Sequence, residues 1–548
     1  MPPPHVNTTS HSSDTDPSPG LRAVLSTGHA ADRADGGRPR TGTPEGITRS
    51  GKITLAVTVT LAALILLPQV VWAPLFGDPG EVQLTAAVGG IGHPPGQAGI
   101  ISLFRLFCLI VPAPPHLTVS AVNALFCLTA VAVLNWAMIR AGGEPLAVVL
   151  VALFYLTDDQ FWHASVLPET YGACFFLLAV AVFCWFSSLQ RGGGWRFWTS
   201  VASFTFLGAN RAPTIMLALP FVLTAMTSDR ARAFLSRNRK RVVAGVIALG
   251  ITSIAVVLGS LWVRDVPGCP YNYLDQSWPS QGGFPNSNTS WENKAKRLWW
   301  LVSARQYDYM FHPTAHTVAG QWVWLKTEFG ARYWPVALIV LAVALFGATR
   351  LWRRDRTLAV FAFSMIPAAL LPILLIRVVS NTTLLPNLLW PYALLFCVGL
   401  SDIIRWRRAP LWRGFVTALV VGVALFFRGG DLLPDKSEFD ARSFIAEVNL
   451  QSLPPDATLL AFDVLPLIYV QQTQNIRPDV KILLYHGRLN ADFVAQTPGR
   501  VFTTLRYASE LPGLDCLGSG AVCELRVRPQ HRQAPPLTRD CGETRNPT

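Results

Sequence analysis

Apolar stretches long enough to cross a membrane recur along most of this chain. A bilayer core is spanned by about 20 residues of α-helix. Charged residues make up only 14% of the 548 residues, against about 25% in a typical soluble domain. The sequence therefore predicts a polytopic α-helical membrane protein with about eleven spans. The predicted spans are residues 53–73, 117–139, 146–160, 167–189, 197–211, 213–227, 241–263, 335–349, 357–377, 386–403 and 412–428.

Lysine and arginine are distributed unevenly between the short loops that join these spans. One set of loops holds 17 of them, whereas the opposing set holds only Arg211. Because basic loops stay in the cytoplasm, we expect a cytoplasmic N-terminus in a bacterial inner (plasma) membrane. The asymmetry requires that the apolar run 98–112 does not span, which predicts an interfacial amphipathic helix there. The net charge of +13 is then mainly an orientation signal, and no nucleic-acid partner is expected. The basic loops are 140–145, 190–196, 228–241, 349–356 and 404–413.

Composition divides the chain into four parts. Residues 1–50 are rich in Ser, Thr, Pro, Gly and Arg, which is typical of a disordered tail. Residues 51–428 form the membrane region, with a Trp-rich outer loop at 264–334. Residues 429–530 have the character of a small extracytoplasmic α/β domain, and 531–548 of a flexible tail.

Strand-like and helical runs alternate within the predicted C-terminal domain. The expected strands are 457–462, 480–485, 500–505 and 523–528, and the expected helices are 437–450 and 464–473. A disulfide between Cys516 and Cys523 is plausible in an oxidising compartment, although pairing with Cys541 or Cys269 is equally open from the sequence.

The first outer loop carries two acids that invite two interpretations. Asp78 can cap a helix that begins at Pro79, with Glu81 closing a capping box. That interpretation leaves unexplained why these are the only charges in 24 outer residues, and why His93 follows on a rigid Pro-Pro turn. General-base catalysis is the alternative.

The second outer loop adds Asp158, Asp159 and Glu169. Capping and helix-dipole stabilisation are the simpler roles for these acids. Acids that converge from neighbouring loops are also what general-base chemistry or a metal would need. Because the oxygen ligands are too few, we expect no metal. The sequence shows no nucleotide-binding loop, zinc spacing or serine-nucleophile motif, so no cofactor is expected.

At these two loops the chain resembles a GT-C class glycosyltransferase family, which contains the animal transmembrane O-mannosyltransferase and bacterial relatives. The family has a D-x-G-E motif after its first span and then H-P-P-G before an interfacial helix. Here Asp78-Pro79-Gly80-Glu81, His93-Pro94-Pro95-Gly96 and the run 98–112 match those features. The resemblance is best over residues 51–227, is weaker over the tail, and between them consists mainly of hydropathy.

Further positions match the family in part. Asn123 matches an Asn in the second span, and Trp162, Glu169 and Tyr171 match a W-x-x-A-x-x-x-E-V-Y motif. Departures are Ser165 and Thr170 within that motif, Asp158-Asp159 where Ser-Pro is usual, and Asn210-Arg211 where Asn-His is common. The tail shares Tyr469, Gln471 and Arg477-Pro478-Asp479-Val480.

The resemblance implies an inverting transferase that moves a sugar, such as mannose, from a polyprenyl-phosphate donor to a hydroxyl of a protein or glycan on the outer membrane face. It implies Asp78 as the base, Glu81 as the residue that orients it or the acceptor, and His93 as a hydrogen-bond donor. An anionic lipid phosphate needs a nearby cation, for which Arg105, Arg211 and Arg377 are candidates; snorkelling to headgroups is the alternative role. The expected substrate-binding residues are His93, Asp158, Asp159, Trp162, Glu169, Tyr171, Arg105, Arg211 and Arg377.

Two other classes of function fit a polytopic protein. A transporter or flippase for lipid-linked glycans would favour charges buried within spans and broken helices, whereas most acids here lie in loops. A non-catalytic scaffold that binds a partner through its outer domain predicts that Asp78 is dispensable.

Overall fold

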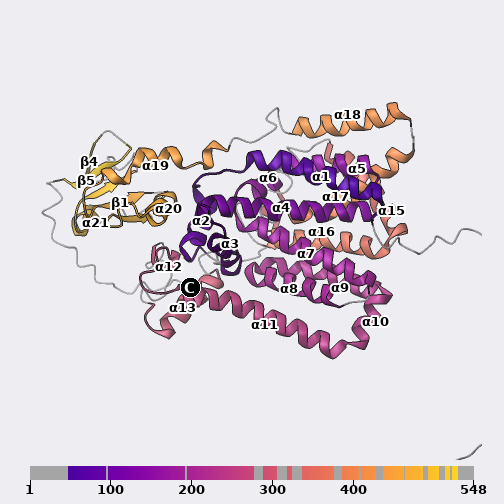
Figure 1. Cartoon of the computed structure of the whole chain (residues 1–548), viewed down its shortest axis with the longest axis horizontal. Coiled ribbons are helices and arrows are strands. Elements are labelled where there is room, and N and C mark those ends of the chain that lie inside the picture. Colours follow the sequence, from indigo (N-terminus) through magenta and orange to yellow (C-terminus); the bar gives the residue numbers. More distant parts are fainter. Residues whose placement is uncertain are drawn as a thin grey trace, which may run out of the picture. The chain divides into compact units, whose positions relative to one another are not determined.

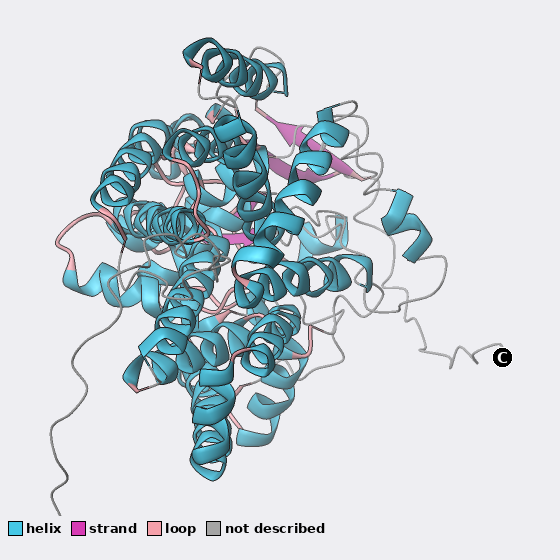
Figure 2. Ribbon diagram, turned by 90° about the vertical axis from the view of Figure 1, so that its right-hand side faces the viewer, coloured by secondary structure: helices cyan, strands magenta, loops and turns pink. Residues whose placement is uncertain are grey.

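The computed structural model of the chain is mostly helical, with one small sheet (Figure 2). It describes residues 47–93, 97–191, 194–276, 288–304, 318–323, 336–375, 386–406, 409–427, 436–461, 463–484, 491–504, 513–518 and 521–528. The chain divides into two compact units, Met1–Ile47 and Thr48–Thr548, and all of the elements below belong to the second.

Each of the eleven predicted spans coincides with a helix or a consecutive pair of helical segments. They are α1 (Arg49–Leu66), α4 (Pro115–Arg140), α5 (Pro145–Leu156), α7 (Thr170–Arg191), α8 (Trp195–Asn210), η2 with α9 (Ala212–Leu217 and Ala218–Thr227), α11 (Arg239–Arg264), α15 (Val336–Arg354), α16 (Arg356–Leu375), α17 (Pro386–Trp406) and α18 (Pro410–Phe427). The remaining described helices of this region are α2 (Gly77–Val88), α3 (Ala98–Ile110), α6 (Asp159–Val166), α10 (Asp229–Arg237), α12 (Tyr273–Gln276) and α13 (Trp291–Val302).

Among the described residues, six helices are long and apolar enough to cross a membrane, or seven if one bent pair counts as a span. The chain is therefore a multi-pass α-helical membrane protein, while the count of eleven spans stays a prediction. Helix α3 has only 13 residues, or about 20 Å of helix, which is too short for a hydrocarbon core of about 30 Å. It buries Ile100 and Phe104 and exposes Leu109, so it has the two faces expected of an interfacial helix.

Two glycines allow α15 and α17 to approach closely. A Cβ on Gly347 would lie 1.9 Å from the carbonyl oxygen of Leu395, and one on Gly399 would lie 2.1 Å from that of Val343. Small residues at such crossings let helix backbones touch, which is how membrane helices gain packing without a hydrophobic driving force. Either glycine replaced by alanine would force these helices apart.

The C-terminal region folds as the predicted α/β domain. Its strands are β1 (Thr458–Ala461), β2 (Lys481–Leu484), β3 (Val501–Thr503), β4 (Leu514–Leu517) and β5 (Cys523–Val527), in the order β2-β1-β3-β5-β4. Strand β1 is parallel to β2 and β3, whereas β5 is antiparallel to β3 and β4. Figure 1 shows the strands together with α19 (Arg442–Val448), α20 (Leu465–Gln474) and α21 (Ala491–Gln496).

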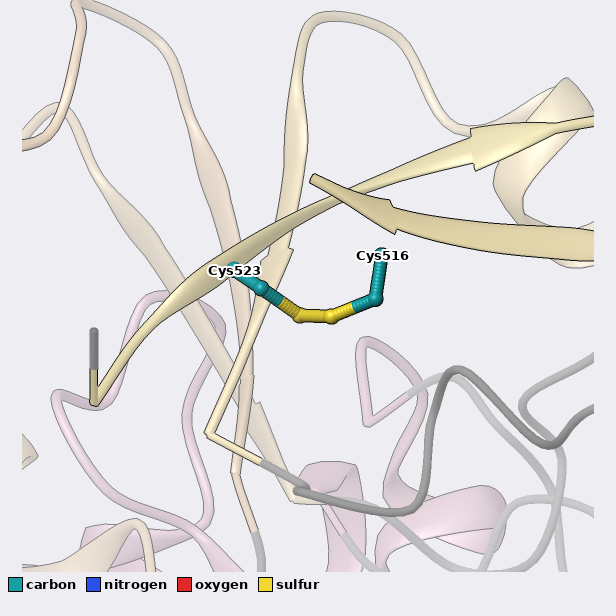
Figure 3. Close-up of a disulfide and its surroundings, with 2 residues drawn as sticks. All are labelled: Cys516 and Cys523. Atoms are coloured by element: carbon teal, nitrogen blue, oxygen red, sulfur yellow. A yellow bond between two sulfur atoms is a disulfide. The ribbon is translucent and has the colours of Figure 1, made fainter. Parts of the chain in front are cut away.

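A disulfide joins Cys516 on β4 to Cys523 on β5, with their Cα atoms 5.6 Å apart (Figure 3). This is the pairing considered plausible from the sequence. Cys269 is a free cysteine, and Cys541 lies outside the described residues. The bridge closes the antiparallel hairpin at the edge of the sheet.

The α/β domain packs directly on α2, the helix that carries Asp78 and Glu81. The backbone N–H of Phe76 donates to Phe439 at 3.1 Å, and that of Ala441 donates to Pro74 at 3.1 Å. Leu84 on α2 is fully buried within the domain's hydrophobic core. The α/β domain therefore helps to fix the position and the orientation of α2.

A second contact joins the domain to the start of α4. The backbone N–H of His116 donates to the hydroxyl of Tyr469 at 3.0 Å, and the imidazole Nδ1 of His116 lies 2.9 Å from the same oxygen. The two rings meet edge to face with centroids 5.7 Å apart.

Candidate active site

Helix α2 presents both acids of the first outer loop, but neither carboxylate caps the helix. Gly77 is the first helical residue, Phe76 occupies the cap position without a side-chain hydrogen bond, and Asp78 lies inside the first turn. The predicted capping box is therefore wrong. The backbone just before the helix is held by the α/β domain, and Gly77 takes φ +61°, a conformation that glycine adopts readily, so the helix begins at Gly77 rather than at Pro79. The Asp78 side chain is 65% exposed.

Glu81 is buried and accepts hydrogen bonds from several directions. The Tyr271 hydroxyl donates to its Oε1 at 2.6 Å, and the backbone N–H of His93 lies 3.1 Å from both of its oxygens. The imidazole Nδ1 of His93 also contacts Oε2. This carboxylate therefore fixes both the ring and the backbone of His93.

The charges of Glu81 and His93 support each other. Burial alone would raise the pKa of the Glu81 carboxyl, but its contacts with His93 outweigh burial and lower that pKa. Burial likewise opposes protonation of His93, yet the carboxylates of Glu81 and Asp78 raise the pKa of His93 to about 10. At neutral pH the two residues form an ion pair, with His93 Nε2 facing Asp78 Oδ2 at 3.8 Å.

The segment that delivers Tyr271 is held against the end of the first outer loop. The backbone N–H of Ile91 donates to Tyr271 at 3.1 Å, and that of Tyr273 donates back to Ile91 at 3.0 Å. A Cβ at Gly90 would lie 2.4 Å from the Tyr271 carbonyl oxygen, so this approach requires glycine.

A buried ion pair holds the same segment against α13. The guanidinium of Arg297 on α13 donates to Asp265 at 3.1 and 3.2 Å and to Asp275 at 2.5 Å. Asn272 donates to Asp265 at 2.8 Å. Arg297 and Asp265 are completely buried, so loss of Arg297 would leave the Asp265 charge uncompensated.

Asp78 and Glu81 from the first outer loop and Glu169 from the second line one cavity with about 390 Å³ of empty space, part of it open to solvent. Five of the predicted site residues are therefore neighbours, although they come from separate parts of the sequence: Asp78, Glu81, His93, Glu169 and Tyr171. The lining residues are Asp78, Glu81, Val82, Thr85, Gly92, His93, Gln97, Ile101, Glu169, Thr170 and Tyr171.

Glu169 stands on the wall formed by the start of α7. Asn123 on α4 donates from its Nδ2 to three carbonyls of the preceding turn, including Leu167 at 2.9 Å. Gly172 lies against the same amide, where a Cβ would meet Asn123 Oδ1 at 2.0 Å. Burial, together with the Asp78 carboxylate, raises the pKa of Glu169 to about 7, although Arg211 and His93 act against this shift.

The predicted cations have different surroundings. The Arg211 guanidinium stacks on the ring of Tyr171, a cavity-lining residue, with its Cζ 4.2 Å from the ring centroid. Arg105 donates to the carbonyls of Ala86 and Ala87 at the C-terminal end of α2, at 3.3 and 2.9 Å. Its contacts hold the helix end rather than reach the cavity. Arg377 lies outside the described residues.

Asp158 and Trp162 of the second outer loop are not among the residues that line the cavity. Asp158 accepts from the backbone N–H of Phe161 at 2.9 Å and so caps α6. Trp162 is fully buried in the main hydrophobic core. The side chain of Asp159 is outside the described part of the chain.

Sequence reasoning missed Gln97, Thr85 and Tyr271. Gln97 precedes α3 and lines the cavity, and its Oε1 is buried without a hydrogen-bond partner among the described residues. Its place directly after His-Pro-Pro-Gly was the available signal. Tyr271 had no local signal, because its role depends on contact with a residue 190 positions away.

The fold and this cavity define a multi-pass membrane protein with a carboxylate-lined cavity, one wall of which is a helix that packs against an α/β domain. No protein-family model matches the chain, and no curated protein matches it in sequence. Among solved structures, the chain is similar to a crystal structure of ArnT from Cupriavidus metallidurans in the apo state, with a TM-score of 0.37 and 11% identity, over 87% of this chain and 98% of that chain. Similarity this low carries no conclusion about the fold or activity of this chain.

Proposed function

We propose that this chain is an inverting glycosyltransferase of the GT-C class. It would move a sugar, such as mannose, from a polyprenyl-phosphate donor to a hydroxyl of a protein or glycan at the outer face of a bacterial inner membrane. The observation that carries the proposal is the cavity shared by Asp78, Glu81, His93 and Glu169. The motif resemblance at the same residues supports it.

In the proposed reaction, Asp78 is the general base. Its exposed carboxylate takes the proton of the acceptor hydroxyl while the acceptor oxygen bonds to the anomeric carbon of the sugar. The bond from that carbon to the phosphate oxygen breaks, and the polyprenyl phosphate leaves with the electron pair. Attack opposite to the leaving group inverts the anomeric centre.

The neighbouring groups would position the base and balance its charge. Glu81 holds His93 as an imidazolium beside Asp78, where the ring would orient the Asp78 carboxylate before the acceptor binds. Arg211, held against Tyr171 at the cavity wall, is the cation best placed to attract the leaving phosphate. Glu169 would contact a sugar hydroxyl or a phosphate oxygen.

The test uses Asp78→Asn, because asparagine keeps the shape of the side chain but cannot take a proton. Since Asp78 caps nothing, the change removes a favourable charge near a helix N-terminus, worth about 0.3–1 kcal/mol, and one of the two carboxylates beside His93. Loss of a positioned base lowers the rate by about 10²- to 10⁴-fold. In a deletion strain, Asp78→Asn should accumulate normally in the membrane yet fail to restore the surface glycans or glycoproteins that the wild type restores.

Asp229→Asn is the matched control, because Asp229 also lies in the first turn of a helix and is exposed. It should restore glycosylation fully. Full restoration by Asp78→Asn as well would contradict the role of Asp78 as the base, and would favour a non-catalytic scaffold if Glu81→Gln behaves in the same way.

A further inference from the structure

A second group of charged side chains lies at the end of α4 that is remote from the cavity. Helix α4 runs from the contact of His116 with Tyr469 to Arg140, a length of about 38 Å. Arginines from four helices surround the loop that follows Arg140. We call the following residues the arginine cluster: Arg140, Arg350, Arg354, Arg405 and Arg413.

Three arginines of the cluster lie against this loop. Arg405 donates to the carbonyl of Gly142 at 2.6 Å. A Cβ on Gly142 would lie 3.8 Å from Arg354 Nη1. Arg413 Nη2 lies 3.9 Å from Glu144 Oε1.

One carboxylate forms ion pairs with three of these five guanidinium groups. Asp402 on α17 is 2.6 Å from Arg354, 3.2 Å from Arg350 and 3.6 Å from Arg405. A single negative charge is thus shared between three positive ones.

The other two carboxylates nearby are already engaged at helix N-termini. Glu144 accepts from the backbone N–H groups of Leu146 and Ala147, at 2.8 and 3.3 Å, where α5 begins. Asp355 accepts from that of Leu358 at 2.9 Å, where α16 begins. Among the described residues, five guanidinium groups therefore face three carboxylates, and two of these are helix caps.

Arg140 has two hydrogen-bond donors without a partner among the described residues. Its guanidinium is held between the rings of Trp136 and Phe186, with its Cζ 5.5 and 5.3 Å from their centroids. Its Nε and Nη1 are buried and have no hydrogen-bond partner in the described part of the chain, and the same is true of Arg413 Nε. Burying such donors without hydrogen-bond partners is unfavourable, so a ligand with acceptor oxygens is expected there.

The chemistry of the donors selects phosphate, because guanidinium groups bind tetrahedral oxyanions through paired hydrogen bonds. The surroundings favour a phosphate carried by a lipid. Trp352, Trp406 and Leu411, each within two residues of a cluster arginine, are 45%, 77% and 88% exposed. Exposed tryptophans beside arginines are typical of the level of lipid headgroups. We propose that the arginine cluster binds the phosphate of an anionic phospholipid.

The test measures binding rather than activity. Full-length protein in neutral detergent is titrated with phosphatidylglycerol, phosphatidylcholine or inorganic phosphate while its thermal unfolding midpoint is followed. Phosphatidylglycerol should raise the midpoint, and phosphatidylcholine should not. Arg140→Gln and Arg413→Gln should each raise the phosphatidylglycerol concentration needed for half-maximal stabilisation by about 10- to 100-fold. This is the range for loss of one charge-assisted hydrogen bond.

Arg232→Gln is the matched control, because Arg232 is an exposed arginine of α10 in an ordinary ion pair with Asp229. It should leave the lipid effect unchanged. If Arg140→Gln does not fold, Arg413→Gln decides, since it leaves the stacked guanidinium in place. Equal stabilisation by phosphatidylcholine, or an undiminished effect in Arg413→Gln, would overturn the proposal. An equal response to inorganic phosphate would keep the phosphate site but overturn the lipid as its occupant.

Discussion

The hydroxyl of Tyr271 donates a 2.6 Å hydrogen bond to Glu81, a residue 190 positions earlier in the chain. This bond joins the segment after α11 to the helix that carries both acids of the first outer loop. Because Glu81 in turn holds His93, the long-range contact fixes the imidazolium beside Asp78. The cavity is thus complete only when two distant parts of the chain have met.

The first prediction concerns pH and stability. The folded pKa of His93 is about 10 and its ordinary value 6.5, so its stabilising contribution is complete below about pH 6.5 and lost as pH rises through 10. Glu81 has a lowered pKa, so its contribution is present above about pH 4.5 and lost as pH falls through the folded value. The thermal midpoint of the wild type should therefore exceed that of Glu81→Gln most between about pH 4.5 and 6.5.

The difference between the two midpoints should shrink steadily towards pH 10. Glu292→Gln serves as the control, because it breaks an exposed pair with Lys296 that should matter little at any pH. A pH-independent gap between wild type and Glu81→Gln would rule out the ion pair with His93.

The second prediction concerns Glu169 and the donor. Burial and the Asp78 carboxylate raise the pKa of Glu169 to about 7, so its ionisation adds a negative charge to the cavity near neutral pH. An anionic donor should therefore bind more weakly above pH 7 than below it. We expect the KM for a polyprenyl-phosphate sugar to rise from pH 6 to pH 8 in the wild type and to stay constant in Glu169→Gln, which mimics the protonated acid. A rise of the same size in the variant would assign the pH dependence to another group.

The third prediction separates binding from stability at Gln97. Its Oε1 is buried without a partner among the described residues, so Gln97→Leu should increase the free energy of unfolding by about 1 kcal/mol. If that oxygen binds substrate, the same change should raise the KM by about 3- to 10-fold. Gln83→Leu is the contrasting variant, because Gln83 bonds the backbone of Leu75 and Ala73 and its loss should destabilise the protein. An unchanged KM in Gln97→Leu would remove Gln97 from the substrate site.

The fourth prediction concerns orientation in the membrane. The distribution of 17 basic residues against one predicts that position 235 faces the cytoplasm and position 450 faces outward. Reporter fusions at these positions should give opposite signals. Signals from the same side would exclude the eleven-span arrangement.

Patterns that depend on neighbouring residues were well predicted from the sequence. Each predicted span coincides with helical structure, and four of the five strands lie within the predicted strand-like runs. The missed strand β4 has only four residues and pairs with β5 alone. Its extended conformation is stabilised by hydrogen bonds to β5, which no local pattern in the sequence of β4 indicates. Helix α21 is likewise only six residues long.

Features that depend on distant contacts were predicted poorly. The acids of the first loop satisfied a local capping pattern, but the backbone before α2 is held by Phe439 and Ala441 of the α/β domain, and the helix starts at Gly77. Trp162 matched a motif for substrate contact, yet it fills the core. Asp78, Glu81, His93 and Glu169 were expected together, and the structure places them around one cavity. Their chemical roles remain the proposal.

The packing of Leu84 inside the α/β domain has a consequence for biosynthesis. Leu84 is made early, whereas its neighbours Val448, Leu459 and Ile482 follow only after the membrane helices have been synthesised. At roughly 5–20 residues per second, the ribosome needs about 20 to 70 seconds to reach them. During that interval α2 lies at the membrane with an uncovered apolar face. The nascent chain therefore already contains Asp78 and Glu81 before the domain that positions them has been synthesised. A ribosome that stops before the last strands would leave an inserted protein with an unfinished site.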